Sequence, residues 1–466
     1  MTEKTDPLVS VYITSYNYER FIREAIESVL AQTLQDFELI VIDDGSTDNS
    51  REVIETFRGD PRIIPIFQHN KGLNVTNNIA LRAARGRYVM RLDADDWLDR
   101  HALEVLAGML EREPQVGLVF PDYYLVDAGG RIIEQVRRHN FGEVTLLDQP
   151  AHGACTMIRR SALLEVGGYD ETFRCQDGYG LWIRFIEHFE VRNVNLPLFF
   201  YRQHGNNLTT NEERVLATRS EMIRRRAETR ASNLQVLGVI AVRGPSVDPY
   251  SPAFRLLGGK PLIEWTIEAA LDARKVARVL VTTPDPDLIA HVGARYGNRA
   301  IALKRDPKLA TPNTYLGDTL RHALKDAETT GMRIDAVLQL SIESPFRAAR
   351  HIDSAVEVME LFETDSVIGV RPETDNFYRH DGAGLIPVRQ TIGLRLEQEE
   401  IYREVGQMRL IKRALVAEGE GIPAGSVGHV VLDQRASIKL MSRYDWAVAE
   451  LLVAALGRGE AIASQP

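Results

Sequence analysis

The feature that most constrains the fold of this chain is an apolar stretch, residues 88–92, that ends in three carboxylates. The acids are Asp93, Asp95 and Asp96. Such closely spaced acids repel one another unless a cation neutralises them, and a hard divalent cation prefers carboxylate oxygens. In an open α/β sheet, sites of this kind gather at the carboxyl ends of the strands. The stretch therefore predicts a buried strand that delivers a metal site. The alternative is a solvated acidic turn before a helix, with Asp96 or Asp99 as its N-cap.

Strands and helices are expected to alternate along both halves of the chain. Strand-like runs occupy residues 9–13, 37–42 and 63–67 of the first half, and stretches with apolar residues at helical spacing separate them. The second half begins a new series, with strand-like runs at 236–242 and 277–283. This alternation predicts α/β folds with parallel, doubly wound sheets, in which strand ends that carry acids share one edge.

The length of the chain predicts two domains, because 466 residues exceed what one ordinary hydrophobic core supports. Between the two series lies a strongly charged stretch with a thin apolar stripe, which we interpret as a helix joining the domains. The predicted boundaries are 1–210 for the first domain, 211–234 for the helical linker and 235–466 for the second domain. The arginine run at 224–226 favours a solvated face over contact with an anionic membrane surface.

Composition and charge exclude several classes of protein. The chain is 44% hydrophobic and 26% charged, as is typical of globular proteins. Its net charge of −9 argues against a general nucleic-acid binder, and no apolar run approaches the roughly 18 residues of a transmembrane segment. The first residues lack the apolar core of a signal peptide, and Cys155 and Cys175 have no metal or redox spacing. We expect a cytoplasmic protein, with a peripheral position at the inner membrane face left open.

Several segments of the first half follow one another in a specific order. They are Val-Ser-Val-Tyr-Ile-Thr-Ser-Tyr-Asn at 9–17, Ile-Val-Ile-Asp-Asp-Gly-Ser-Thr-Asp at 40–48, Leu-Asp-Ala-Asp-Asp at 92–96, and Gly-Gly-Tyr-Asp-Glu-Thr-Phe at 167–173 with Gln-Asp at 176–177. In order and spacing, this half resembles the family 2 glycosyltransferases of GT-A fold. The resemblance implies an enzyme that transfers a sugar, with inversion, from a nucleotide-sugar donor to a glycan or glycoconjugate acceptor in surface polysaccharide biosynthesis.

The resemblance also assigns roles in donor binding. It implies that Thr14, Tyr16 and Asp44 line the base and ribose pocket, where Asp44 accepts a hydrogen bond from a pyrimidine N–H. The alternative role of Asp44 is to cap the next turn. Asp93 and Asp95 are implied to form the Asp-x-Asp motif that holds Mn²⁺ or Mg²⁺, with Asp95 as the direct ligand and Asp93 also towards the ribose. The metal would neutralise the leaving diphosphate.

Two further residues receive roles from the resemblance. Asp177 falls at the position of the catalytic base, which takes the proton of the acceptor hydroxyl on the far face of the sugar. The alternative is a surface acid that caps the helix containing Leu181. His204 lies in a segment, Tyr-Arg-Gln-His, that resembles a late family segment, and is implied to reach the diphosphate or the metal. A lone histidine is as often structural.

The first half departs from the family in two places. Where the family often has Ala-Arg-Asn before the acidic strand, this chain has Thr76-Asn77-Asn78, so a base-contacting arginine is missing and the nucleotide stays open. The Gln-x-x-Arg-Trp motif of processive synthases is absent. We therefore expect an enzyme that adds a single sugar.

Three segments of the second half carry another resemblance. They are Ile-Ala-Val-Arg-Gly-Pro-Ser at 240–246, Leu-Gly-Gly-Lys-Pro-Leu-Ile-Glu-Trp at 257–265 and Leu-Gln-Leu-Ser-Ile-Glu-Ser-Pro-Phe-Arg at 338–347. This half resembles the cytidylyltransferases that activate acidic sugars as CMP-sugars. The resemblance implies a doubly wound nucleotide-binding fold, in a type of domain that commonly pairs into homodimers.

The residues that carry the chemistry of that second family are altered. Asp248 and Pro249 stand where a loop with lysine and arginine should hold the triphosphate. The loop at 341–343 is changed, and Lys439 and Met441 replace two acids that hold Mg²⁺. We expect a degenerate domain for binding, docking or oligomerisation. The rivals are a two-activity enzyme whose second half makes a CMP-sugar donor, and a non-catalytic carbohydrate-binding scaffold.

Overall fold

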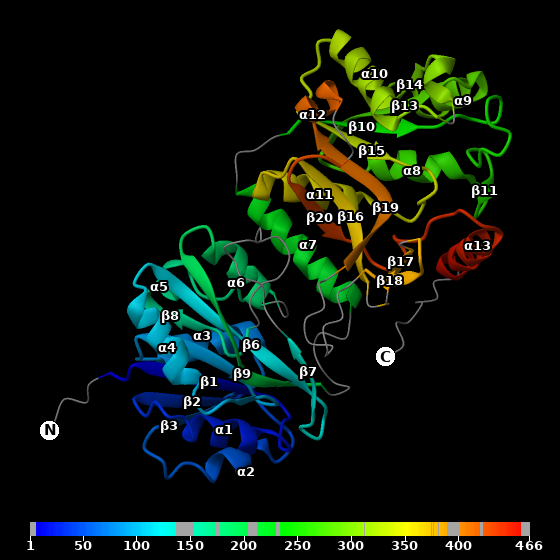
Figure 1. Ribbon diagram of the computed structural model, residues 1–466. Helices are drawn as coiled ribbons and strands as arrows, with labels where there is room; N and C mark the ends of the chain where they lie inside the picture. Colours follow the sequence, from blue (N-terminus) through cyan, green and yellow to red (C-terminus); the bar gives the residue numbers. More distant parts are fainter. Residues whose placement is uncertain are drawn as a thin grey trace. The chain divides into compact units, whose positions relative to one another are not determined.

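The computed structural model describes most of the chain. The described residues are 6–136, 153–173, 177–203, 212–229, 234–311, 313–373, 375, 377–380, 382–388, 401–419 and 423–457, with the backbone alone at 177 and 212–215. The chain divides into two compact units, residues 1–211 with 376–399 and residues 212–375 with 400–466 (Figure 1).

The first unit is built on one mixed sheet with the strand order β3-β2-β1-β4-β8-β6-β9-β5 and with β7 paired to β6. The strands are β1 (Val9–Ser15), β2 (Phe37–Asp43), β3 (Ile63–Phe67), β4 (Tyr88–Asp93), β5 (Trp97–Leu98), β6 (Val116–Val126), β7 (Ile132–Val136), β8 (Met157–Arg159) and β9 (Glu190–Arg202). β1 to β4 run parallel, whereas β8 is antiparallel to β4 and β6. The prediction of a parallel sheet is therefore wrong for β8, for β7, which forms a hairpin with β6, and for β5, which is antiparallel to β9. β9 runs parallel to β6. A hairpin gives antiparallel neighbours, whereas parallel neighbours require a crossover.

Helices cover both faces of this sheet. They are α1 (Ile22–Leu30), α2 (Ser50–Glu55), α3 (Leu73–Ala83), α4 (Ala102–Arg112), α5 (Arg160–Glu165) and α6 (Asp177–Phe185). Successive side chains of a strand point to opposite faces. Val11 and Ile13 of β1 therefore pack with α1 and α4, and Tyr12 packs with α3, α5 and α6. Burial on both faces explains the nearly continuous apolar run of β1.

The second unit holds a sheet with the order β14-β13-β10-β15-β19-β16-β20. Its strands are β10 (Val236–Ala241), β13 (Val276–Thr283), β14 (Ala300–Lys304), β15 (Ala336–Leu340), β16 (Ser366–Glu373), β19 (Ile401–Lys412) and β20 (Val427–Val431). β19 is antiparallel to both of its neighbours, so this sheet is also mixed rather than parallel. One short pair, β11 (Leu256–Leu257) with β12 (Lys260–Pro261), stands outside it. Another, β17 (Tyr378–His380) with β18 (Leu385–Pro387), is separate from both large sheets and lies in the stretch 376–399 that belongs to the first unit.

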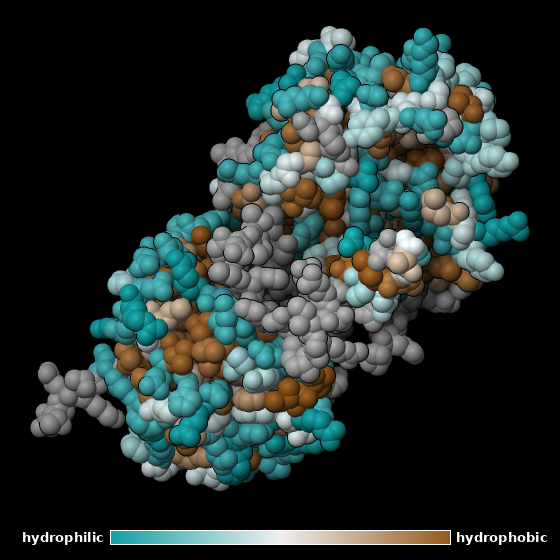
Figure 2. All heavy atoms as spheres, viewed as in Figure 1, coloured by the Kyte–Doolittle hydropathy of each residue, from teal (hydrophilic) through white to brown (hydrophobic). Residues whose placement is uncertain are grey.

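The helices of the second part of the chain complete the α/β pattern. They are α7 (Glu212–Glu228), α8 (Leu262–Leu271), α9 (Pro286–Tyr296), α10 (Leu316–Thr329), α11 (Ala349–Phe362), α12 (Arg413–Glu418) and α13 (Arg443–Gly457). Hydrophilic residues predominate on the faces shown in Figure 2, where hydrophobic ones form separate patches. Among the described residues, no helix combines the length and the apolar character needed to cross a membrane.

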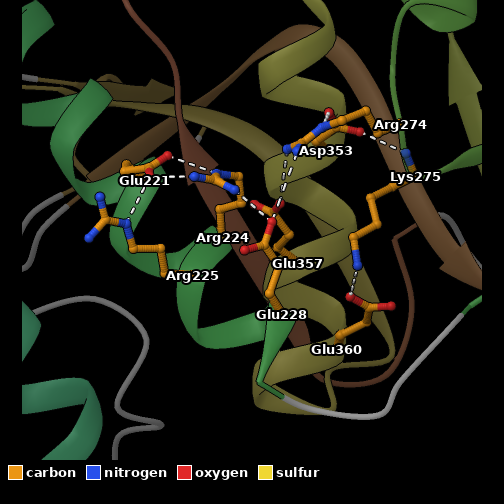
Figure 3. A network of polar contacts seen from close by, with 9 residues as sticks. All are labelled: Glu221, Arg224, Arg225, Glu228, Arg274, Lys275, Asp353, Glu357 and Glu360. Carbon is orange, nitrogen blue, oxygen red and sulfur yellow. Dashed lines mark hydrogen bonds and ion pairs between the residues drawn. The ribbon is translucent and has the colours of Figure 1, made fainter.

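The charged helix predicted as a linker forms as α7, but it belongs to the second unit and packs on α11. Three buried acids of α11, Asp353, Glu357 and Glu360, lie one helical turn apart along the face that meets α7 and the turn Arg274–Lys275 (Figure 3). Lys275 Nζ lies 2.7 Å from Glu360 Oε2. Helix α7 thus packs within the second unit, and its role as a linker between the domains stays a prediction.

Glu357 is the least exposed acid of this interface, at 2%. Arg274 Nη2 lies 3.9 Å from its Oε1. Burial, and then the charge of Asp353, raise the pKa of Glu357 to about 7, although Lys275, Arg274 and Arg224 act in the opposite direction. The carboxyl group is therefore held in its neutral form well above the pH at which an ordinary glutamate ionises.

We predict that the free energy of unfolding of the wild type falls as pH rises, and that this fall is absent in Glu357→Gln. A carboxyl group whose folded pKa is raised from 4.5 to about 7 stabilises the fold below its ordinary pKa. That contribution disappears as pH rises through about 7, a change on the order of 3 kcal/mol. Glutamine stays neutral throughout, so its stability should not fall in this window. Unfolding of the full chain, followed from about pH 5 to about pH 8, measures the difference.

The exposed Glu418 of α12 offers a matched control, since Glu418→Gln removes a solvated carboxylate from the same unit. Its stability should follow the wild-type pH profile. Equal pH profiles for Glu357→Gln and the wild type would contradict the prediction.

Candidate active site

Three strands of the first unit end side by side. The order β3-β2-β1-β4 places a topological switch point between β1 and β4, where open α/β sheets form a ligand crevice at the carboxyl ends of the strands. Thr14 of β1 is in register with Asp93 of β4, and Ser15 is in register with Asp43 of β2. The structure thus places Thr14 and Asp93, two of the predicted site residues, at neighbouring positions.

Polar side chains join the loops that follow β1 and β2. The Asn17 N–H donates to Ser46 Oγ (2.9 Å), and Asn17 Oδ1 accepts from the Thr47 N–H (2.8 Å). Asp48 accepts from the Glu19 N–H (3.0 Å). These bonds fix the edge of the crevice at which Tyr16 stands with 46% of its surface exposed. An exposed ring at this edge is suited to stacking on a nucleotide base.

Asp44 organises the loop that leads into α3. Its carboxylate accepts from the side-chain amide of Gln68 (2.7 Å) and from the N–H groups of Lys71 and Gly72 (both 2.9 Å). Asp44 therefore bonds to residues 68–72. In the sequence, the alternative to base binding was that Asp44 caps the turn that directly follows it. A carboxylate has about four acceptor positions, so one remains for a base N–H, and that contact stays a prediction.

An arginine of the same strand accompanies the first acid of the loop 93–96, the acidic loop. Arg91 and Asp93 lie two residues apart on β4, so their side chains share one face. Arg91 Nε lies 2.8 Å from Asp93 Oδ1, and Arg91 Nη2 donates to Asp93 Oδ2 at 3.3 Å. The Arg91 side chain is 6% exposed and that of Asp93 is 24% exposed. Asp93 is therefore paired on one side and open to solvent on the other.

A second arginine, Arg202 of β9, holds the rest of the acidic loop. Its N–H donates to Asp96 Oδ1 and its Nε donates to the carbonyl oxygen of Asp95, both at 2.9 Å. Nη1 donates to the carbonyl oxygen of Ala128 at 3.1 Å. Because Arg202 lies more than a hundred residues from the loop in sequence, only the folded sheet brings these groups together.

Aromatic rings hold the Arg202 guanidinium in place. Its Cζ lies 4.7 Å from the ring centre of Phe21 and 4.6 Å from that of Trp97, and Nη2 donates to Glu24 Oε2 at 2.5 Å. Trp97 in turn stacks on Phe200, with ring centres 4.8 Å apart. A guanidinium fixed by rings and a carboxylate forms a rigid support for the backbone of the acidic loop.

The acidic loop carries more negative charge than these arginines offset. Burial, followed by the charges of Asp95 and Asp93, raises the pKa of Asp96 well above its usual range. Burial and the same acids raise the pKa of Tyr18, which places its phenol close to the loop. Within the described residues, Asp96 Oδ2 has no hydrogen-bond partner. A further cation at this loop would relieve the repulsion.

The residues at this loop fit Mg²⁺ or Mn²⁺. Asp93 and Asp95 supply hard carboxylate oxygens, and such ions commonly use one or two protein carboxylates together with water and phosphate oxygens. The described residues contain no group of three His, Cys, Asp or Glu side chains that could hold a metal ion by themselves.

Two asparagines of α3 hold the segment that precedes α6. Asn78 donates to the Tyr169 carbonyl oxygen (2.8 Å) and accepts from the Tyr169 N–H (2.9 Å). Asn74 donates to the carbonyl oxygens of Asp170 (2.7 Å) and Phe173 (2.8 Å). A side chain at Gly168, where φ is +68°, would meet Asn78 Oδ1. Asn78, in the stretch where the family often has a base-contacting arginine, thus fixes the loop that contains Tyr169.

The remaining predicted residues are placed only in part. Asp177 is the first residue of α6, and the structure describes its backbone alone. His204 and Cys175 lie outside the described residues. The roles of Asp177 as base and of His204 at the diphosphate therefore stay predictions.

Sequence reasoning missed Arg91, Arg202, Tyr18 and the α3 asparagines. A signal for both arginines was present, because each interrupts an otherwise apolar strand next to a motif. A buried arginine in such a position needs anionic or carbonyl partners. The partners of Arg202 could not be named, since they come from segments far away in the sequence, whereas Asp93, the partner of Arg91, lies two residues along the same strand.

The first part of this chain is similar to known proteins. Residues 10–167 match the sequence model of the family described as Glycosyl transferase family 2. A chondroitin synthase of Escherichia coli is 37% identical over 210 residues, which cover 44% of this chain and 30% of that protein. An uncharacterized glycosyltransferase of Methanocaldococcus jannaschii is 33% identical over 192 residues, covering 40% of this chain and 66% of that protein. This chain therefore spans less than two thirds of the length of either relative.

A solved structure, S. aureus TarS 1-349 in complex with UDP-GlcNAc, shares 20% identity with a TM-score of 0.41 and covers 47% of this chain and 65% of that chain. At this TM-score the likeness supports no conclusion. The family match and the relatives show that the N-terminal half of this chain contains a family 2 glycosyltransferase domain. The family model does not extend to the second unit.

We predict that Arg202→Met destabilises the protein by roughly 3 kcal/mol, because breaking a buried ion pair leaves uncompensated charge and unpaired carbonyls. Methionine keeps apolar bulk between Phe21 and Trp97, so the loss reports on the polar contacts. Urea unfolding of the full chain measures the effect. Arg23→Met is the matched control, since Arg23 makes a 51%-exposed pair with Glu27 and should change stability by less than about 1 kcal/mol. Equal stabilities of the two variants would contradict the prediction.

Proposed function

We propose that the first unit transfers a sugar, with inversion, from a nucleotide-sugar donor to a glycan or glycoconjugate acceptor, in the cytoplasm and with Mn²⁺ or Mg²⁺. The observation that carries this proposal is the acidic loop with excess negative charge at the switch point, beside Thr14 and Tyr16. Asp93 and Asp95 would hold the metal, which when bound neutralises the leaving diphosphate. The match to a chondroitin synthase supports a glycan acceptor and polysaccharide biosynthesis.

The chain's own residues account for the remaining chemistry. Tyr16 stacks on the base, and Asp44 accepts from a base N–H if its last acceptor position is used. Asp177 takes the proton from the acceptor hydroxyl as that oxygen attacks the anomeric carbon. The position of Asp177 as the first residue of α6, shortly after the loop 168–173 that Asn74 and Asn78 fix, supports this assignment.

We predict that UDP, GDP or CDP stabilises the wild type only when Mn²⁺ or Mg²⁺ is present. At about 100 times its Kd, the recognised diphosphate should add roughly 2.7 kcal/mol, which a thermal-shift assay detects. Asp95→Asn should lose this response while folding normally. Asp36→Asn, which removes an exposed carboxylate just before β2, should keep it. A metal-independent response in the wild type would count against the proposal.

A second prediction concerns the base. Asp177→Asn should lower the rate of sugar transfer by roughly 10²–10⁴-fold, the usual contribution of a general base, and should leave the metal-dependent diphosphate response intact. Turnover is measured with the donor class identified by the shift assay. Undiminished turnover in Asp177→Asn would remove this residue from the mechanism.

For the second unit we propose a degenerate cytidylyltransferase-like domain that still binds an anion. Arg305, after β14, is 4% exposed; its Nη2 donates to the Val242 carbonyl oxygen (2.9 Å), and its Nε has no acceptor among the described residues. Burial, and then the charge of Arg243, lower the pKa of Arg305 to about 10. Two neighbouring guanidinium groups with little local counter-charge favour an anionic ligand.

The loop after β10 supports the loss of catalysis. Its Ser246 N–H donates to Asp285 (2.8 Å), and its Asp248 N–H donates to the Gly244 carbonyl oxygen (2.8 Å). N–H groups used inside the protein cannot cradle a triphosphate. Asp248 also lies 3.8 Å from Arg243, where it offsets part of the positive charge.

We predict that inorganic phosphate stabilises the wild type without a divalent metal, and that Arg305→Met loses this response. The unliganded variant should be at least as stable as the wild type, because a buried, poorly paired charge is removed. Arg299→Met, at an exposed position, is the control. Formation of a CMP-sugar from CTP by the wild type would instead establish the two-activity rival.

A further inference from the structure

Arg91 is enclosed between the acidic loop and the chain segment that enters β8. On one side its guanidinium pairs with Asp93. On the other side lies Gly153, where an added Cβ would stand 2.7 Å from Arg91 Nη2, 3.0 Å from Cζ and 3.1 Å from Nη1. Three similar distances mean that the backbone of Gly153 covers the guanidinium group and leaves no room for a side chain.

The segment 153–156 is also joined to the backbone of β4. The Cys155 N–H donates to the Arg91 carbonyl oxygen at 2.7 Å. Cys155 adopts a φ of +55°, an uncommon value for a non-glycine residue. Immediately after it, β8 pairs with β4, with Met157 in register with Met90. The segment is therefore held against both the backbone and the side chain of Arg91.

We infer that Arg91 is a positioning residue that sets the Asp93 carboxylate for the metal, and that Gly153 sets Arg91 by closing its other side. The inference rests on the proposed function, because it takes Asp93 and Asp95 as the metal-holding pair. It adds that the segment 153–156 controls metal affinity without touching the metal. Partners that orient a ligating carboxylate in this way typically change metal affinity by roughly 10–100-fold when they are altered.

Charge and geometry make opposite predictions for this site. If Arg91 acts only as a nearby positive charge, it repels a divalent cation, and Arg91→Met should bind the ion more tightly. If Arg91 positions Asp93, variants that keep the charge but disturb its placement should bind the ion more weakly. Arg91→Lys keeps the charge and loses the planar fork. Gly153→Ala keeps the whole arginine and displaces it from Asp93.

The experiment titrates Mn²⁺ into the full chain in the presence of a saturating mixture of UDP, GDP and CDP, with thermal stabilisation as the readout. Gly153→Ala and Arg91→Lys should each raise the Mn²⁺ concentration for half-maximal stabilisation by about 10-fold or more. Their melting temperatures without Mn²⁺ report whether the fold is intact. Gly108→Ala on α4 is the matched control, because its added Cβ would meet only Arg112 Nη1, at 3.5 Å.

Turnover supplies a second readout. At saturating Mn²⁺, Gly153→Ala should recover most of the wild-type kcat, whereas its half-saturating Mn²⁺ concentration stays raised. Wild-type Mn²⁺ affinity in both Gly153→Ala and Arg91→Lys would overturn the inference and leave the proposed function standing. A wild type that shows no Mn²⁺-dependent response would overturn the metal-dependent function, and this inference with it.

Discussion

The repulsion among Asp93, Asp95 and Asp96 is the constraint on which the first unit depends. A strand that ends in three acids can be buried only if other parts of the chain approach with positive charge or N–H groups. Arg91 supplies the first contact from the same strand, and Arg202 supplies the others from β9. What remains uncompensated is a negative charge at the open end of the crevice, where a cation and a diphosphate would complete the balance.

Hydrogen bonds between side chain and backbone set the rest of the crevice. Asp44 accepts hydrogen bonds from the loop before α3, and Asn74 and Asn78 of that helix donate hydrogen bonds to carbonyl oxygens of the loop before α6. Each is a buried polar group whose burial is tolerated because its partners are main-chain groups that no regular element satisfies.

The second unit shares two features with the first, a switch point in its sheet and buried charged groups, but its switch-point loop differs. Its sheet also carries a switch point, between β10 and β15, but the loop at that point uses its N–H groups internally. Its helix α7 packs on α11, which carries Glu357, whose carboxyl pKa is raised to about 7 by burial and by Asp353. The arginines of α7, which in the sequence indicate a solvated linker, lie on the side where α11 carries its buried acids (Figure 3).

Periodicity and local motifs were sufficient for the strands and helices that alternate and for the strand ends at Thr14 and Asp93, because these depend on neighbours in sequence. The family match to residues 10–167 agrees with the order of the motifs. The antiparallel strands β8 and β19, the docking of α7 and the contacts of Arg202 were decided only by the tertiary structure. Strand direction and buried charge depend on partners far along the chain, and a sequence pattern specifies that a buried arginine needs an acceptor without specifying which one.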